Sequence, residues 1–134
     1  MLKAIKVIAA LSGLAWALPA GAVTVSIACG TVGAEFDRCR EGIDAWSKKT
    51  GNEVRIVQTP PSATERLAVY QQLLAAKSGD VDVFQIDIVW PGILGVHFMD
   101  MTRTVGESIK QHFPPIVAAN TVNGQLVGVP WFTD

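Results

Sequence analysis

Two segments of the chain alternate apolar and polar residues, which is the period of a β-strand: residues 23–28 and residues 53–58. Between them, residues 35–49 repeat apolar side chains at helical spacing, as a stripe formed by Phe36, Cys39, Ile43 and Trp46. Acidic residues in the first turn and lysines in the last turn suit the helix dipole, and Gly51 stands where a helix ends. The pattern predicts strand, helix and strand.

The next segment continues this alternation. Ser62 to Glu65 have the order of a capping box, in which a hydroxyl and a carboxylate satisfy the first backbone donors of a helix. We predict that this helix runs to about Ser78. Residues 81–86 then form a third strand, apolar enough to lie inside a sheet.

The remaining pattern is less regular. Residues 90–98 predict a short helix with Pro91 near its first turn. The polar segment 102–112 predicts another short helix, which Pro114-Pro115 interrupts. Asn123-Gly124, between two short extended runs, predicts a β-hairpin.

Strands that alternate with helices predict an α/β layer with parallel strands. In such sheets, ligands bind beyond the carboxyl ends of the strands. Applied to this chain, that rule selects three connecting segments as the candidate site: residues 30–35, 59–66 and 86–90.

The first 22 residues have a different composition from the rest. Lys3 and Lys6 precede an uncharged apolar run from Val7 to Leu18, and Ala20-Gly21-Ala22 forms a small-x-small cleavage site. We predict a signal peptide cleaved after Ala22 and a periplasmic product of residues 23–134, one small domain. The alternatives are an uncleaved anchor and a buried helix, but the run is short for a bilayer.

Charge excludes one class of partner. Without Lys3 and Lys6, nine of the 11 Lys and Arg residues remain against 12 Asp and Glu, which gives a net charge of −3. No basic cluster is left in residues 23–134, which argues against nucleic acid.

The two cysteines, Cys29 and Cys39, form an even pair. In an oxidising compartment such a pair predicts one disulfide, whereas free buried thiols and lipidation of Cys29 are the alternatives. Lipidation fits poorly because Cys29 lies well past the apolar run. Two thiolates without a neighbouring histidine make an incomplete zinc shell, so we expect neither a metal nor another cofactor.

The candidate chemistry favours binding over catalysis. The Gly30–Gly33 loop lacks the pattern of a nucleotide-binding loop. Carboxylates, a guanidinium and aromatic faces at the predicted strand ends suit a sugar: Glu35, Arg66, Asp87, Trp90, Trp131 and Asp134. Each has a plainer alternative: Glu35 as a partner of the helix dipole, Arg66 as a solvated helix residue, Asp87 as a cap, and Trp90 and Trp131 as core. A secreted glycoside hydrolase using Glu35 and Asp87 is the competing function.

Two motifs carry a family resemblance: residues 80–91, DVDVFQIDIVWP, and residues 123–134, NGQLVGVPWFTD. Together they resemble family 1 extracellular solute-binding proteins, the sugar receptors of ABC importers, and most of all the trehalose/maltose-binding branch. The start at residues 29–35, CGTVGAE, with Cys39 in the next helix, is similar too.

The resemblance implies a periplasmic binding protein-like fold, with two α/β lobes that close around a sugar by a hinge. It implies a membrane permease as partner, no enzymatic activity, and sugar contacts from Glu35, Arg66, Asp87, Phe132 and Asp134, with Phe132 where relatives often carry Tyr. We expect a monomer. Because the chain stops where the second lobe would begin, we expect part of an amino-terminal lobe, and a truncated fragment without function is a further alternative.

Overall fold

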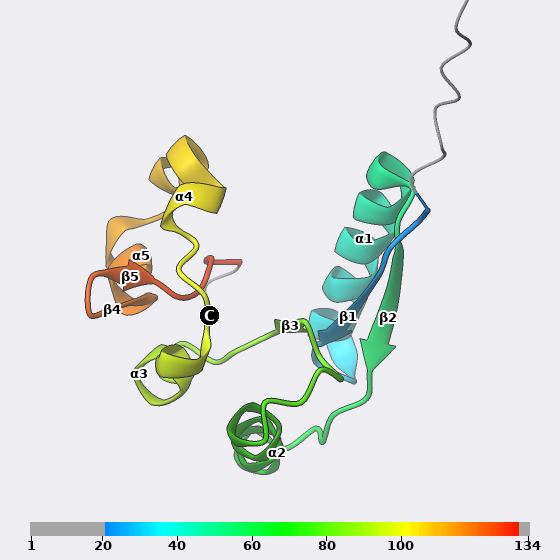
Figure 1. Cartoon of the computed structure of the whole chain (residues 1–134), viewed down its shortest axis with the longest axis horizontal. Coiled ribbons are helices and arrows are strands. Elements are labelled where there is room, and N and C mark those ends of the chain that lie inside the picture. Colours follow the sequence, from blue (N-terminus) through cyan, green and yellow to red (C-terminus); the bar gives the residue numbers. More distant parts are fainter. Residues whose placement is uncertain (1–20, 132–134) are drawn as a thin grey trace, which may run out of the picture.

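Three parallel strands organise the fold, which a computed structural model describes for residues 21–131 (Figure 1). β1 (Thr24–Ala28) lies between β2 (Glu53–Val57) and β3 (Val83–Phe84), and both pairings are parallel. The predicted α/β class and parallel strands are therefore confirmed. The apolar run of the predicted signal peptide lies outside the described residues.

Two long helices connect these strands. α1 (Gly33–Thr50) ends at Gly51, whose left-handed φ of 73° suits glycine. α2 (Ala63–Ala75) begins at Ser62, whose hydroxyl accepts a hydrogen bond from the Glu65 backbone N–H at 3.4 Å, the serine half of the predicted capping box. α2 ends earlier than the predicted Ser78, because Lys77 turns into the left-handed region with φ 51°.

The third strand is shorter than predicted and lies at the edge of the described sheet rather than inside it. Only Val83 and Phe84 pair with residues of β1 in the sheet, because the Asp82 side chain bonds to β1 just before the start of β3. The carboxylate of Asp82 accepts hydrogen bonds from the backbone N–H and the hydroxyl of Ser26, at 2.7 and 2.6 Å. These bonds hold the pKa of Asp82 below its usual range. A carboxylate thus replaces part of the expected strand ladder.

The chain after β3 consists of short elements: α3 (Pro91–Leu94), η1 (Gly95–His97), α4 (Thr102–Val105), η2 (Gly106–Gln111), α5 (Pro114–Ala119), β4 (Thr121–Val122) and β5 (Gln125–Leu126). The predicted hairpin is confirmed, with Asn123 and Gly124 both at positive φ in its turn. Figure 1 shows α4, α5 and the hairpin gathered on the far side of the molecule from α1. The prolines of Pro114-Pro115 begin α5 instead of breaking a helix, since a proline fits the first turn.

The core sits where α2 meets the sheet and α3. It contains Ala28, Tyr70, Val81, Trp90 and Leu94. The Tyr70 ring meets the rings of Phe84 and Trp90 edge-on, with centroids 4.9 and 5.7 Å away. Each such pair contributes about 0.5–1.5 kcal/mol beyond simple burial. This cluster fixes α2 and the start of α3 against the carboxyl ends of the strands. Among residues 21–131, no helix is long and apolar enough to cross a membrane.

Candidate functional site

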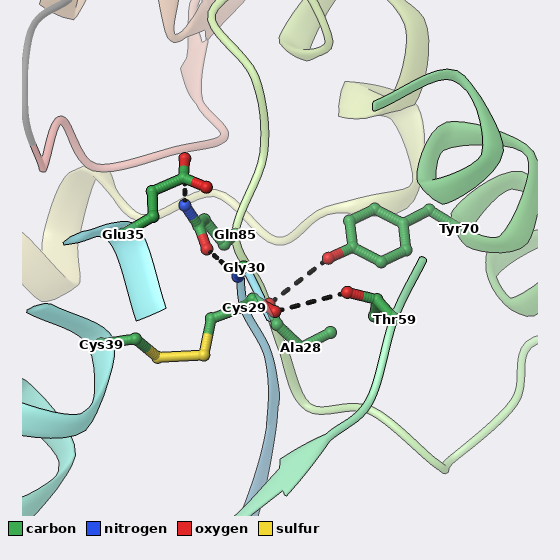
Figure 2. Close-up of a disulfide and its surroundings, with 8 residues drawn as sticks. All are labelled: Ala28, Cys29, Gly30, Glu35, Cys39, Thr59, Tyr70 and Gln85. Carbon is green, nitrogen blue, oxygen red and sulfur yellow. Dashed lines mark hydrogen bonds between the residues drawn. A yellow bond between two sulfur atoms is a disulfide. The ribbon is translucent and has the colours of Figure 1, made fainter. Parts of the chain in front are cut away.

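The carboxylate of Glu35 is held in place at the carboxyl end of the sheet (Figure 2). The Gln85 side chain, just past β3, donates from Nε2 to Glu35 Oε1 at 2.9 Å. The same amide accepts from the Gly30 backbone N–H through Oε1. A Cβ on Gly30 would lie 2.6 Å from Glu35 Oε2, so this position has room only for glycine as long as the carboxylate lies there. Two segments far apart in the chain, residues 30–35 and the residue after β3, thus meet at one carboxylate.

The predicted disulfide between Cys29 and Cys39 is confirmed. It joins the residue after β1 to the second turn of α1, with the two Cα atoms 6.6 Å apart (Figure 2). The two alternatives, free thiols and lipidation at Cys29, are therefore excluded. The bond anchors the segment that carries Gly30 and Glu35.

Arg66 is buried, with only 9% of its surface exposed, so its interpretation as a solvated helix residue is wrong. Its guanidinium carbon lies 5.6 Å from the centre of the Trp90 ring, a cation–π arrangement. Its Nε has no hydrogen-bond partner among the described residues. A buried guanidinium donor without a partner is a group that a polar ligand can satisfy. Trp90 itself is 4% exposed and belongs to the core, as its alternative interpretation held.

Tyr70 is a completely buried phenol at the carboxyl end of β1. Burial raises its pKa to about 12, the charge of Arg66 opposes the rise, and the charge of Glu35 adds to it. Both charges therefore act on the same phenol. Its hydroxyl donates to the Ala28 carbonyl at 3.4 Å, at the end of β1. Glu35 and Arg66 each lie in the first turn of a helix that follows a strand of the sheet, α1 after β1 and α2 after β2.

Asp87 lies beyond the end of β3 and is exposed. Its carboxylate accepts from the Val89 N–H at 3.1 Å, and its carbonyl accepts from the Trp90 N–H at 3.0 Å. Asp87 therefore shapes the turn that leads into α3 but does not cap that helix, because Trp90 occupies the N-cap position and no side chain caps α3.

Two of the candidate residues, Phe132 and Asp134, lie outside the described residues. Trp131 is half exposed at the end of the described chain. Sequence reasoning missed Gln85, although it immediately precedes the strand-end segment 86–90 that the carboxyl-end rule selects. Within residues 21–131, no group of three His, Cys, Asp or Glu side chains is arranged to hold a metal ion.

Two of the curated proteins that are similar to this chain come from Deinococcus and Thermotoga, whereas no family model matches it. One is a "Probable ABC transporter-binding protein" of Deinococcus radiodurans, 52% identical over 134 residues, which cover 96% of this chain and 32% of that protein. The other, an "Uncharacterized protein in bglA 3'region" of Thermotoga maritima, is 32% identical over 71 residues, or 52% of this chain and 72% of that protein. The chain thus spans about a third of the length of the Deinococcus relative.

Two of the solved structures that share the fold hold maltose and D-mannitol. Maltose-bound MalE3 of T. maritima superimposes with a TM-score of 0.75 and 32% identity, over 83% of this chain and 29% of that one. An ABC transporter solute-binding protein of Agrobacterium vitis, with bound D-mannitol, gives a TM-score of 0.64 and 27% identity, over 78% of this chain and 26% of that one. The resemblance to solute-binding proteins and the periplasmic binding protein-like fold are confirmed.

Proposed function

We propose that this chain, a homologue of the solute-binding proteins of ABC transporters, contributes one face of a sugar-binding site to an extracytoplasmic import receptor. The observation that carries the proposal is the position of Glu35 and Arg66 in the first turns of α1 and α2, the helices that follow the carboxyl ends of the parallel strands β1 and β2. This is the place where sheets of this kind bind ligands.

The chemistry of the pair suits sugar hydroxyls. The Glu35 carboxylate only accepts hydrogen bonds and the Arg66 guanidinium only donates them, so together they can bind both ends of a hydroxyl network. Both groups are charged, and hydrogen bonds to charged groups are about twice as strong as neutral ones. Asp87, Trp131, Phe132 and Asp134 complete the proposed set of contacts.

An α-linked disaccharide such as maltose or trehalose is the proposed ligand. One solved relative holds maltose and another holds D-mannitol, so polyhydroxylated ligands recur among structures that share this fold. The proposed receptor is a monomer in the periplasm, exported by a signal peptide that is cleaved after Ala22. It performs no covalent chemistry: sugar binding shifts the lobes to a closed form, which a membrane permease then recognises.

Calorimetric titration of the full-length protein that carries these residues tests the proposal, with maltose, trehalose and D-mannitol as ligands. We expect saturable binding of a disaccharide. Heats of dilution alone for all three would overturn the sugar-receptor assignment.

A chromogenic α-glycoside separates the receptor from the competing hydrolase. We expect no release of the chromophore. Release that is abolished in the Glu35→Gln variant would instead establish catalysis by Glu35 and would contradict the receptor assignment.

A further inference from the structure

We propose that Gln85 is a positioning residue, which fixes the Glu35 carboxylate in its binding orientation before a sugar arrives; this inference rests on the proposed sugar site. The two residues are 50 positions apart in the chain, and their side chains meet at 2.9 Å. Gln85 does not itself need to touch the sugar. Its effect on binding passes through Glu35.

The orientation of the Gln85 amide follows from its two partners. The Gly30 N–H is a donor and therefore faces Oε1, whereas the Glu35 carboxylate is an acceptor and therefore faces Nε2. Neither an apolar side chain nor a carboxylate can satisfy both partners. Glutamine matches both because it carries a donor and an acceptor on one planar group.

The backbone of Gln85 is anchored as well. Its N–H donates to the Ala28 carbonyl at 2.8 Å, which continues the pairing between β1 and β3. The side chain therefore extends from a fixed point on the sheet toward the first turn of α1. The other carboxylate oxygen of Glu35 lies where a Cβ on Gly30 would stand only 2.6 Å away, so the absence of a side chain at Gly30 leaves room for it. Figure 2 shows the Gln85 amide between Glu35 and Gly30, bonded to both.

The hydrogen bond from Gln85 to Glu35 has a consequence for affinity. A glutamate side chain that is free to rotate must be ordered when it binds a ligand, and that ordering weakens binding. If Gln85 orders the carboxylate in advance, removing its amide should weaken sugar binding about tenfold, with the contact between Glu35 and the sugar still present.

Gln85→Met tests the inference, because methionine keeps the length of the side chain and loses both hydrogen bonds. Gln71→Met, the same substitution at an exposed position of α2, is the matched control. In the full-length protein we expect the Kd for the bound disaccharide to rise about tenfold in Gln85→Met and to stay unchanged in Gln71→Met. An unchanged Kd in Gln85→Met would overturn the inference.

A double-mutant cycle distinguishes positioning from a general loss of structure. In a Glu35→Gln background, Gln85→Met should change the Kd less than about twofold, because the group it positions is already altered. An equal factor in both backgrounds would mean that Gln85 acts independently of Glu35 and would contradict the inference.

Two further outcomes remain interpretable. If Gln85→Met fails to fold, Gln85→Glu replaces it: this variant keeps the shape but turns a carboxylate toward Glu35, so we expect a larger rise in Kd, and an unchanged Kd overturns the inference. If the wild-type protein binds no sugar, the proposed function fails, and this inference fails with it. Wild-type binding with unaffected variants removes only the role of Gln85.

Discussion

The carboxyl ends of the strands and the segment from α4 to β5 are held together by different kinds of contact. At the strand ends, side-chain hydrogen bonds join residues between 30 and 55 positions apart, such as Gly30 with Gln85 and Glu35 with Gln85. Between residues 102 and 127, the side-chain hydrogen bonds of Ser108, Asn120 and Thr121 span only three or four positions. The backbone bond from Met101 to Leu126 is a longer link there.

Burial follows the same division. Ala28, Cys29 and Tyr70 are completely inaccessible, whereas the hairpin segment buries mainly Leu126 and Val127, and Phe113 is 70% exposed. The candidate binding groups stand on the part with long-range contacts. A site that must hold a carboxylate and a guanidinium in fixed positions needs such a frame, because local turns alone leave side chains free to reorient.

The largest expected effect comes from a substitution at the centre of the core, beside the strand ends. Tyr70→Ala removes a completely buried ring and its contacts with two other aromatic rings, and should lower the free energy of unfolding by about 3–5 kcal/mol. Phe113→Ala, in the other region, should cost less than about 0.5 kcal/mol, because that ring is exposed. Denaturant unfolding of the full chain measures both. Similar losses for the two variants would remove the distinction between the regions.

The disulfide gives the next largest effect. It closes a loop between residues 10 positions apart. Because the loop restricts the unfolded chain, the disulfide should raise the free energy of unfolding by about 3 kcal/mol. Reductant should therefore lower the denaturation midpoint of the wild-type chain. The variant with both Cys29 and Cys39 changed to Ser should have a denaturation midpoint near that lower value, and reductant should not change it. A thiol titration of denatured, unreduced protein checks the bond directly, and two titratable thiols would refute it.

The smallest expected effect is a loss of stability at high pH that comes from Tyr70. Its ionisation can be followed without interference from another tyrosine, because Tyr70 is the single tyrosine of the chain. Its pKa is about 12 in the folded protein and 10.0 in an exposed tyrosine. The folded state therefore favours the protonated phenol, and the stability it contributes is present below pH 10 and lost as the pH rises toward 12. By pH 11 the loss should be about 1.4 kcal/mol.

Phenolate absorbance gives the measurement for that prediction. The folded protein should titrate near pH 12, and the denatured protein near pH 10. The alkaline loss of stability should be absent in Tyr70→Phe. A midpoint near 10 in the folded state would mean that the phenol is not buried as described.

Periodicity predicted the long elements because they show enough repeats to reveal it: β1, β2, α1 and α2 all lie close to their predicted positions. Short elements offer less than two turns of pattern, so α5 was missed and its prolines were interpreted as a break. The strand β3 was overestimated, because nothing in the sequence states that the Asp82 side chain bonds to Ser26.

For the candidate site too, some features could be predicted from the sequence and others could not. The rule for parallel sheets located Glu35 and Arg66, since it needs only the order of strands and helices. It does not reveal partners that meet only in space, so the Gln85–Glu35 bond and the stacking of Arg66 on Trp90 emerged only from the structure. The binding roles of the whole set stay predictions: Glu35, Arg66, Asp87, Trp131, Phe132 and Asp134.

Arg66 tests the central claim, that the strand ends bind a sugar, most directly. Calorimetric titration with maltose and trehalose compares the full-length wild-type protein with Arg66→Met, which keeps much of the apolar contact with Trp90 and loses the charged donors. We predict saturable binding by the wild type and a Kd raised about 10- to 100-fold in the variant, with a retained cooperative melt. If the wild type binds one of these sugars and Arg66→Met binds it with the same Kd, the account is contradicted.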